Sequence, residues 1–307
     1  MSNSSQPGHL FCFGLGYTAT NLARKLTSTG WQVSGTCRDE EKQAELRGLG
    51  IEAHLFDRDR ALAEIDGLLA GVTHLLSSVP PDDRGDPVLD LHGDDLRGRE
   101  HLQWIGYLST TGVYGDRKGG WVDETSELTP SGMRGARRLA AERQWLQLSP
   151  PAHLFRLAGI YGPGSSAIET VQAGRAKRIH KPGQVFSRIH VDDIVQVLMA
   201  SIDHPSPGSA YNVCDDDPAS PADVIAYACE LLGRQPPPVI PFAEAELSPM
   251  ARSFYDDNKR VSNERIKREL GVSLLYPSYR QGLEAIHQDD GGQRRKRMNG
   301  KSKGEKS

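Results

Sequence analysis

The amino-acid sequence predicts an α/β protein, in which a Rossmann-type doubly wound parallel sheet carries a smaller C-terminal substrate lobe. Three observations predict this fold. Apolar, strand-like runs alternate with helical patterns through the first half of the chain. The first of these runs leads directly into a glycine turn and a helix. From about residue 159 the alternation loosens into short helices, isolated strands and turns that contain Gly and Pro.

Each element follows from its local pattern. The apolar runs predict strands near 9–14, 31–37, 51–56, 72–78, 103–109 and 153–158. The segments between them have helical spacing, which predicts helices at 18–29, 39–48, 60–69, 86–100 and 133–148. Gly30, Gly50 and Gly71 stand where C-terminal caps are expected. In the second half, the predicted helices are 165–174, 192–203, 221–232, 259–270 and 278–288, with an extended connector at 236–238.

The turn after the first strand, Gly14-Leu-Gly16-Tyr17-Thr18-Ala19, has the spacing G-x-G-x-x-A. The first glycine permits a tight turn, the second lets the backbone approach a pyrophosphate, and the small Ala19 allows close packing of helix on strand. The helix that begins near Thr18 supplies free N–H groups and a partial positive charge. An ordinary strand-to-helix turn could share this spacing, but the preceding buried strand and the following helix favour a dinucleotide site.

The end of the second strand bears on the choice between NADP and NAD. An NAD site usually places a carboxylate there for the ribose 2′-hydroxyl, about twenty residues after the turn. This chain has Thr36-Cys-Arg38 instead. The guanidinium of Arg38 can pair with a 2′-phosphate, so we predict NADP as the cofactor. Asp39 and Glu40 beside it keep NAD as an alternative, and Arg38 would then be a solvated side chain.

Polar and small residues at the ends of the third and fourth strands are further candidates for the cofactor site. Asp57 could accept a hydrogen bond from the adenine amine, or it could cap the following helix. Ser77, Ser78 and Val79 lie at the carboxyl edge of the sheet, where ligands of open α/β folds bind. His74 is expected to be a core histidine, because it lies within the strand.

Composition limits the classes of partner. With 307 residues, 37% hydrophobic and 25% charged, the chain is long enough for a full core in one large domain or in two that share an interface. No apolar run approaches the roughly 18 residues of a membrane helix, and the polar start lacks a secretory signal, so we expect a cytoplasmic protein without membrane contact. Reduced, mostly buried thiols and no metal site are expected, because the cysteines have no C-x-x-C spacing (Cys12, Cys37, Cys214, Cys229).

Residues 290–307 are basic and have almost no apolar side chains to bury, which predicts a disordered tail. Without this tail the body of the chain is acidic, which argues against nucleic acid as a specific partner. The predicted organisation is therefore a flexible N-terminus at 1–8, an NAD(P)-binding domain at 9–158, a substrate lobe interleaved with the sheet at 159–289, and the basic tail.

Three further segments carry a family resemblance. They run from Leu108 to Asp116 (LSTTGVYGD), from Arg156 to Gly164 (RLAGIYGPG) and from Arg188 to Asp193 (RIHVDD). With the glycine turn, in this order, they resemble the extended short-chain dehydrogenase/reductases, the NAD-dependent epimerase/dehydratase family. The likeness covers roughly residues 9 to 290. It implies the Rossmann fold, a nicotinamide cofactor and activity on nucleotide sugars or related metabolites, and helices beside the sheet that often form homodimers.

The resemblance also implies roles for single residues. Gly14, Gly16 and Ala19 match the pyrophosphate turn, in a version one residue tighter than is usual in the family. Thr110 matches the Ser or Thr that hydrogen-bonds a substrate carbonyl or hydroxyl. Tyr161 begins a turn that matches the segment lining the nicotinamide end of the site. The segment from Arg188 to Asp193 matches a structural motif that opens a helix of the substrate lobe, where Asp192 or Asp193 would be the N-cap.

The chain departs from the family at the catalytic pair Tyr-x-x-x-Lys. Arg134 stands where the Tyr belongs and Arg138 where the Lys belongs. Arginine stays protonated at any working pH, so neither can exchange a proton with the substrate. Two guanidinium groups one helical turn apart repel each other unless an anion lies beside them. A bound phosphate or carboxylate would supply the negative charge, as would Glu142 paired with Arg138 at i, i+4.

Two functions are compatible with this sequence. In the first, the protein binds NADP and performs oxidoreductase or epimerase-type chemistry on a nucleotide sugar or another anionic small metabolite. Thr110 would then hold the substrate oxygen, Arg134 would bind an anion, and the proton would come from Tyr114 or water, although Tyr114 could equally be a packing residue. In the second, the protein is a non-catalytic sensor that reads the NADP/NADPH ratio, since the family's Tyr and Lys are missing.

Overall fold

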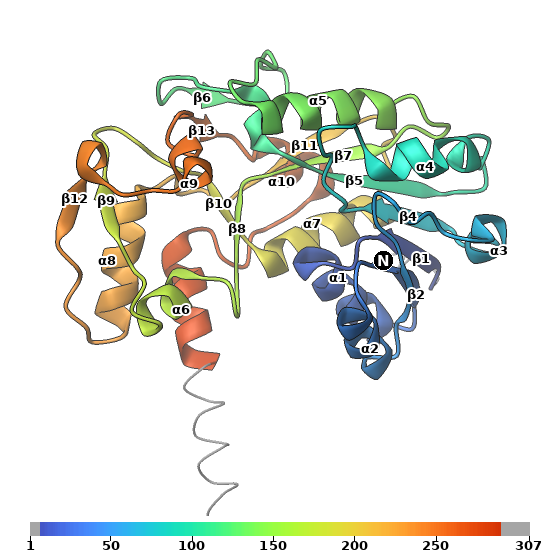
Figure 1. Ribbon diagram of the computed structural model, residues 1–307, viewed down its shortest axis with the longest axis horizontal. Helices are drawn as coiled ribbons and strands as arrows, with labels where there is room; N and C mark the ends of the chain where they lie inside the picture. Colours follow the sequence, from blue (N-terminus) through green and yellow to red (C-terminus); the bar gives the residue numbers. More distant parts are fainter. Residues whose placement is uncertain (1–6, 290–307) are drawn as a thin grey trace, which may run out of the picture.

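The computed structural model describes residues 7–289 of the chain. Its central feature is a seven-stranded, entirely parallel sheet (Figure 1). The strand order is β11-β7-β5-β4-β1-β2-β3, so the chain winds outward in both directions from β1 as a doubly wound fold does. The strands are β1 His9–Phe13, β2 Gln32–Cys37, β3 Glu52–Leu55, β4 His74–Ser77, β5 Trp104–Thr110, β7 His153–Leu157 and β11 Ala210–Val213.

Helices cover both faces of this sheet. Side chains of α1, α2, α7 and α10 pack into one hydrophobic cluster, and those of α3, α4 and part of α5 pack into the other. In Figure 1, α4 and α5 lie above the sheet, and α1 and α7 lie below it. The bounds are α1 Tyr17–Thr27, α2 Glu40–Gly48, α3 Ile65–Leu69, α4 Pro87–Leu96, α5 Met133–Trp145, α7 Val191–Asp203 and α10 Glu264–Leu270.

The C-terminal lobe is made of short elements and has its own two hydrophobic clusters. Parallel two-stranded pairs join β8 to β10, β9 to β12 and β6 to β13. Helix α8 packs on α6 and β9, and a last helix covers 279–289. The remaining bounds are β6 Trp121–Val122, β8 Gly159–Tyr161, α6 Ala167–Gln172, β9 Arg178–His180, β10 Arg188–His190, α8 Pro221–Leu231, β12 Val239–Pro241, α9 Pro249–Ser253, β13 Arg260–Val261, and the 3-10 helices η1 Thr111–Tyr114 and η2 Phe242–Glu244.

The six predicted strands and the helices between them are present, with differences at some ends. The predicted helix 60–69 begins only at Ile65, because Asp57 and Arg60 form a bridge that holds the chain in a turn. The predicted helix 259–270 begins at Glu264, since Arg260 and Val261 pair with β6 instead. Strand β11 had no individual prediction from the sequence. Gly30, Gly50 and Gly71 all have positive φ, as the C-cap prediction requires.

The prediction for the start of α7 was wrong in two respects. Its N-cap is His190, whose Nδ1 accepts a hydrogen bond from the backbone N–H of Asp192 (3.2 Å). The Asp193 carboxylate instead accepts the N–H groups of Leu275 (2.6 Å) and Tyr276 (3.1 Å), so it anchors a distant loop. Helix α7 also packs against α1 in the sheet core and does not belong to the C-terminal lobe.

The structure confirms buried, free thiols for all four cysteines. It also confirms that His74 lies in the core, where it is 4% exposed and its Nδ1 is 2.8 Å from the Thr73 hydroxyl oxygen. Burial lowers the pKa of His74 to about 4. Within residues 7–289, no helix is both long and apolar enough to span a bilayer. Residues 1–6 of the predicted flexible N-terminus lie outside the described residues, as does the predicted basic tail at 290–307.

Candidate functional site

The glycine turn lies at the carboxyl end of β1, next to the ends of β2 and β4. Gly14 has a φ of +85°, a conformation that favours glycine. Its N–H donates to the hydroxyl oxygen of Thr36 (2.8 Å), and the N–H of Leu15 donates to the carbonyl of Thr36 (2.7 Å). On the other side, the Ser78 hydroxyl donates to the carbonyl of Gly14. Thr36 and Ser78 therefore hold the turn in place from both neighbouring strands.

The N-terminus of α1 is open. Gly16 is its N-cap residue, and no side chain caps the helix. A Cβ added at Gly16 would meet no atom within 4 Å. Thr18 and Ala19 are buried in the first turn, so close packing of the helix on the sheet is achieved there. The uncapped N–H groups and the free space fit the pyrophosphate of a dinucleotide, which accepts such hydrogen bonds at a helix N-terminus.

Tyr17, the first residue of α1, joins the glycine turn to the C-terminal lobe. Its side chain is 39% exposed, and its hydroxyl donates to the carbonyl of Pro163 (3.0 Å). A Cβ at Gly162 would lie 2.5 Å from that hydroxyl oxygen and 2.7 Å from Cγ1 of Val191, so a larger residue there would displace both side chains. The sequence placed Tyr17 and the segment after Tyr161 at the same site, and the structure brings them into direct contact.

At the end of β4, the hydroxyl of Ser77 is a polar group without a partner. Ser77 is 0% exposed, and its Oγ has no hydrogen bond among the described residues. An unpaired buried hydroxyl is unfavourable unless a ligand or a water molecule reaches it. Val79 lies against Gly14, because a Cβ on that glycine would be 3.1 Å from its Cγ2. The carboxyl edge of β4 thus adjoins the glycine turn.

The tip of β2 presents an unpaired guanidinium. Arg38 is exposed, and within the described part of the chain it has no ion pair. The neighbouring Asp39 does not compete for it, because Asp39 caps α2 by accepting the N–H of Lys42 (2.8 Å). The alternative role of Asp57 as a helix cap was wrong. Its carboxylate accepts the N–H of Asp59 (3.0 Å) and pairs with Arg60 (3.0 Å) in a turn.

Thr110 and Tyr114 follow the end of β5 but have different surroundings. Thr110 is half-buried, and its Oγ1 accepts the N–H of Gly112 (3.1 Å), which leaves its own hydrogen free to donate. Tyr114 is 0% exposed. Its hydroxyl donates to Asn212 Oδ1 (2.7 Å) and accepts from Arg156 Nη1 (3.0 Å), and burial raises its pKa to about 12. Tyr114 therefore has the surroundings of a packing residue.

Helix α5 carries the two arginines at the family's catalytic positions. Arg134 is exposed, and its guanidinium carbon lies 5.3 Å from the ring centroid of Phe254, just after α9. Arg138 donates from Nη1 to the carbonyl of Leu108 (2.7 Å) and to the hydroxyl of Tyr107 (3.2 Å). Arg138 thus fixes α5 to β5, whereas the guanidinium of Arg134 is available to a ligand.

The proposed pairing of Glu142 with Arg138 was wrong. Glu142 is 1% exposed and binds Arg156 on β7, through contacts of 2.9 Å to Nη2 and 3.2 Å to Nε. The hydroxyl of Ser109 also donates to this carboxylate. Together with Tyr114 and Asn212, these side chains form a buried polar network beneath the site. The sequence contained no spacing signal for it, because its members come from four separate segments.

Two further placements complete the site. Tyr161 is 7% exposed and its hydroxyl donates to the carbonyl of Ser278 (3.4 Å), so its side chain faces the C-terminal lobe.

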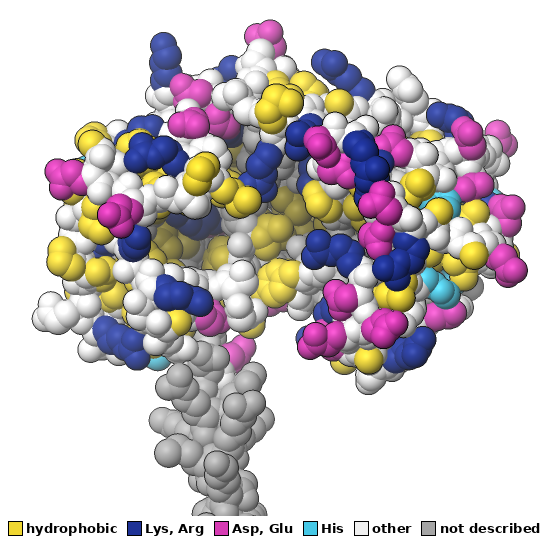
Figure 2. Space-filling model, viewed as in Figure 1, with side chains coloured by type: hydrophobic (Ala, Val, Ile, Leu, Met, Phe, Trp, Pro, Cys, Tyr) yellow, Lys and Arg dark blue, Asp and Glu magenta, His cyan; other side chains and the backbone are white. Residues whose placement is uncertain are grey.

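Figure 2 shows a hollow between this lobe and the sheet domain, with Lys and Arg side chains along its rim. Among the described residues, no cluster of His, Cys, Asp and Glu could hold a metal ion.

Comparisons with known proteins agree with this geometry. A solved structure from Methylobacillus flagellatus, described as a proposed NAD-dependent epimerase/dehydratase, is 26% identical, with a TM-score of 0.71 over 92% of this chain and 98% of that one. Structural neighbours of the chain are thus members of the NAD-dependent epimerase/dehydratase family. A conserved protein of unknown function from Silicibacter pomeroyi is 53% identical, with a TM-score of 0.86 over 92% of this chain and 99% of that one.

Among curated proteins, YeeZ from Escherichia coli is 28% identical over 281 residues, which is 86% of this chain and 94% of YeeZ. Two solved structures with lower identity share the fold. They are a dTDP-glucose 4,6-dehydratase from Bacillus anthracis in complex with NAD (15% identical, TM-score 0.73, covering 92% and 96%) and the human epimerase family protein SDR39U1 with NADPH (16% identical, TM-score 0.69, covering 91% and 99%). No family model matches the chain.

Proposed function

We propose that this protein is a member of the NAD-dependent epimerase/dehydratase family that binds NADP(H) and acts as an oxidoreductase or epimerase-type enzyme on a small anionic metabolite. The observation that carries the proposal is the uncapped N-terminus of α1 behind Gly16, which has room for a pyrophosphate. Distantly related structures hold NAD or NADPH on the same fold, which supports a nicotinamide cofactor. The unpaired Arg38 favours NADP over NAD, because a guanidinium can form charge-assisted hydrogen bonds with a 2′-phosphate.

Each residue of the site has a defined task in this proposal. The bound cofactor supplies a nicotinamide that accepts or donates hydride. The free hydrogen of Thr110 donates to a substrate carbonyl or hydroxyl oxygen. Arg134 binds a phosphate or carboxylate of the substrate from the exposed start of α5. Water exchanges the proton, because Arg134 and Arg138 stay protonated and the hydroxyl of Tyr114 is committed to Asn212 and Arg156.

The proposal is tested by incubating the purified chain with NADPH or NADP and a panel of carbonyl and hydroxyl compounds that carry phosphate or carboxylate, nucleotide sugars included. We expect a change in the absorbance band of reduced nicotinamide with at least one compound. Epimerisation without net redox change is followed by chromatography of the products. Arg134→Gln should raise KM for that compound, whereas Arg143→Gln, an exposed arginine further along α5, should not. Failure of every compound in both assays would contradict an enzymatic role.

A non-catalytic NADP(H) sensor is the second candidate, and the arginines on α5 favour it. Arg138 donates hydrogen bonds from Nη1 to the Leu108 carbonyl and the Tyr107 hydroxyl, so it fixes α5 to the sheet and does not serve as a proton donor to a substrate. The combined variant Arg134→Tyr/Arg138→Lys separates the two functions. Oxidoreductase activity that arises only in this variant would favour the sensor. Loss of an activity that the natural chain already has would favour the enzyme.

A further inference from the structure

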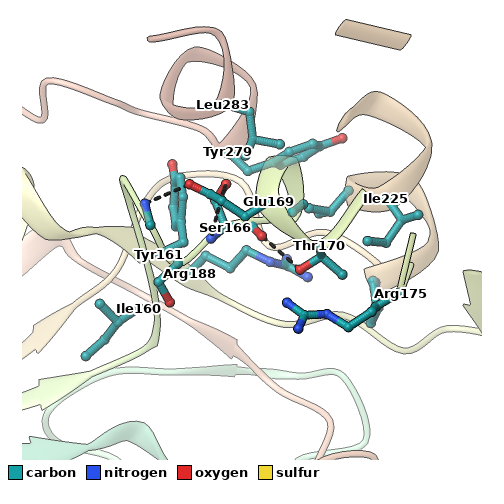
Figure 3. A pocket seen from close by; sticks show the side chains of 15 residues that line it. Ile160, Tyr161, Ser166, Glu169, Thr170, Arg175, Arg188, Ile225, Tyr279 and Leu283 are labelled. Atoms are coloured by element: carbon teal, nitrogen blue, oxygen red, sulfur yellow. Dashed lines mark hydrogen bonds between the residues drawn. The ribbon is translucent and has the colours of Figure 1, made fainter. Parts of the chain in front are cut away.

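The C-terminal lobe contains a cavity of about 480 Å³ that the proposed function does not use (Figure 3). Its walls come from β8, β10, α6, α8 and the helix 279–289. Tyr161 and Gly164, which line it, flank the turn at Pro163 that receives the hydroxyl of Tyr17. The cavity is therefore separated from the glycine turn by this short segment. Its volume lies in the range that binds small molecules.

One part of the wall is positively charged. Arg188 lines the cavity, and its Nη1 is fixed by the carbonyls of Phe186 (2.8 Å) and Ala219 (2.9 Å). Within residues 7–289, no carboxylate lies within ion-pair distance of this guanidinium, and its Nε and Nη2 have no hydrogen-bond partner. Arg188 is half-buried, and a partly desolvated charge without a counter-ion is unfavourable, so an anion in the cavity would stabilise it.

No acidic side chain of the described residues forms an ion pair with Arg188, although the charge of Asp217 acts on it from a distance. Glu169 also lines the cavity and keeps its negative charge, but its oxygens accept from the N–H groups of Gly164 (2.7 Å) and Ser166 (2.9 Å) and from the Ser166 hydroxyl. Asp215 is 1% exposed, and burial raises its pKa to about 8, so it is mostly uncharged at neutral pH. Arg175, a second arginine of the lining, also has no ion pair within the described chain and adds positive charge at the cavity.

The rest of the wall is apolar or aromatic. Tyr161 and Tyr279 contribute rings, and the aliphatic side chains are those of Ile160, Val224, Ile225 and Leu283. Figure 3 shows Arg175 and Arg188 on one side of the cavity, with Tyr279 and Leu283 on the opposite side. Ile160 is 39% exposed, although it is a large hydrophobic residue. A ligand that fits this cavity has an anionic group for the arginines and an apolar or aromatic body for the other wall.

We infer that this cavity is a binding site for a small organic anion, a carboxylate or phosphate monoester on an apolar or aromatic body. Arg188, oriented by two backbone carbonyls, holds the anionic group through Nε and Nη2, and Arg175 adds attraction from the exposed side. The site lies outside the cofactor turn and needs no nicotinamide, so it goes beyond the proposed function. Its binding can be measured whether or not the protein turns over a substrate.

The test uses the full chain and isothermal titration calorimetry with phenyl phosphate and with benzoate, each compared with phenol as the uncharged counterpart. We expect at least one of the two anions to bind tenfold or more tightly than phenol. Tighter binding of phenyl phosphate would identify a phosphate site, and tighter binding of benzoate a carboxylate site. Absence of binding by both anions, or equal binding of anions and phenol, would overturn the proposal.

Substitutions of residues that line the cavity test whether the anion binds there. Arg188→Gln should weaken binding of the preferred anion about tenfold or more, and Arg188→Lys by less, because it keeps the charge but loses the planar fork. Since Arg188 also bonds two carbonyls, two variants that leave it intact are included. Arg175→Gln should weaken binding about threefold, and Ile225→Trp, which fills the cavity, should abolish it. The matched control Arg143→Gln should bind as the natural chain does. Unchanged affinity in Arg175→Gln and Ile225→Trp would overturn the proposal.

Discussion

Replacing Glu142 by Gln tests the buried network beneath the site. Both side chains of the Glu142–Arg156 pair are at most 5% exposed, and the carboxylate accepts three hydrogen bonds. In Glu142→Gln, the new NH2 group must face either Arg156 Nη2 or the donors of Ser109 and Arg156 Nε. One charge-assisted bond is lost and the guanidinium keeps an uncompensated charge, so we expect a loss of about 3–5 kcal/mol in the free energy of unfolding.

The assay is urea unfolding followed by tryptophan fluorescence, since Trp145 lies on the same helix as Glu142. Glu45→Gln is the matched control, because Glu45 belongs to an ion pair with Lys42 and is 51% exposed. That substitution should cost less than about 1 kcal/mol. A double-mutant cycle with Arg156→Met should give a coupling energy of about 1–3 kcal/mol. Equal midpoints for Glu142→Gln and Glu45→Gln would refute the reasoning.

Three other outcomes are expected. Gly16→Val should leave the midpoint of thermal unfolding within about 2 °C, because a Cβ at this position meets no atom within 4 Å. The same variant should bind NADPH tenfold or more weakly, because the valine side chain occupies the space of the pyrophosphate. Unchanged NADPH affinity in calorimetry would contradict this. Arg38→Gln should weaken NADPH binding about tenfold and leave NADH binding unchanged, and an equal effect on both would exclude a 2′-phosphate contact. Because the pKa of Asp215 is raised from 3.8 to about 8, the folded state holds more protons than the unfolded state between these pH values, so this group's contribution to stability falls as pH rises through that window. Asp215→Asn should therefore be more stable than the natural chain at pH 8 and similar to it near pH 4 in urea titrations, and a constant difference across that range would contradict the assignment.

Periodicity and turn chemistry were sufficient to predict six of the seven strands of the sheet, because they act within a few residues. Buried parallel strands are continuous apolar runs, and a helix that ends at a left-handed glycine can be identified from one residue. The glycine turn was predicted for the same reason, since Gly14 and Gly16 act through their own backbone. Strand β11 escaped prediction because it pairs with β7, more than fifty residues earlier in the chain, and no local pattern encodes that partner.

The candidate site was predictable in part. Its positions at strand ends follow from topology, so the sequence placed Ser77, Ser78 and Arg38 on the correct edge. Side-chain partners do not follow from spacing. Glu142 is one helical turn from Arg138, yet it binds Arg156 across the core. A buried carboxylate needs hydrogen-bond donors, and it takes those that the fold brings nearest to it in space. The contact of Arg134 with Phe254 joins segments 120 residues apart, and only the folded chain shows it.

Calorimetric titration of the purified chain with NADPH and with NADH tests the central claim most directly. The open N-terminus of α1 predicts that a nicotinamide dinucleotide binds, and the unpaired Arg38 predicts that NADPH binds about tenfold more tightly than NADH. The absence of binding heat with either dinucleotide would contradict the pyrophosphate site. Tighter binding of NADH would contradict the role of Arg38.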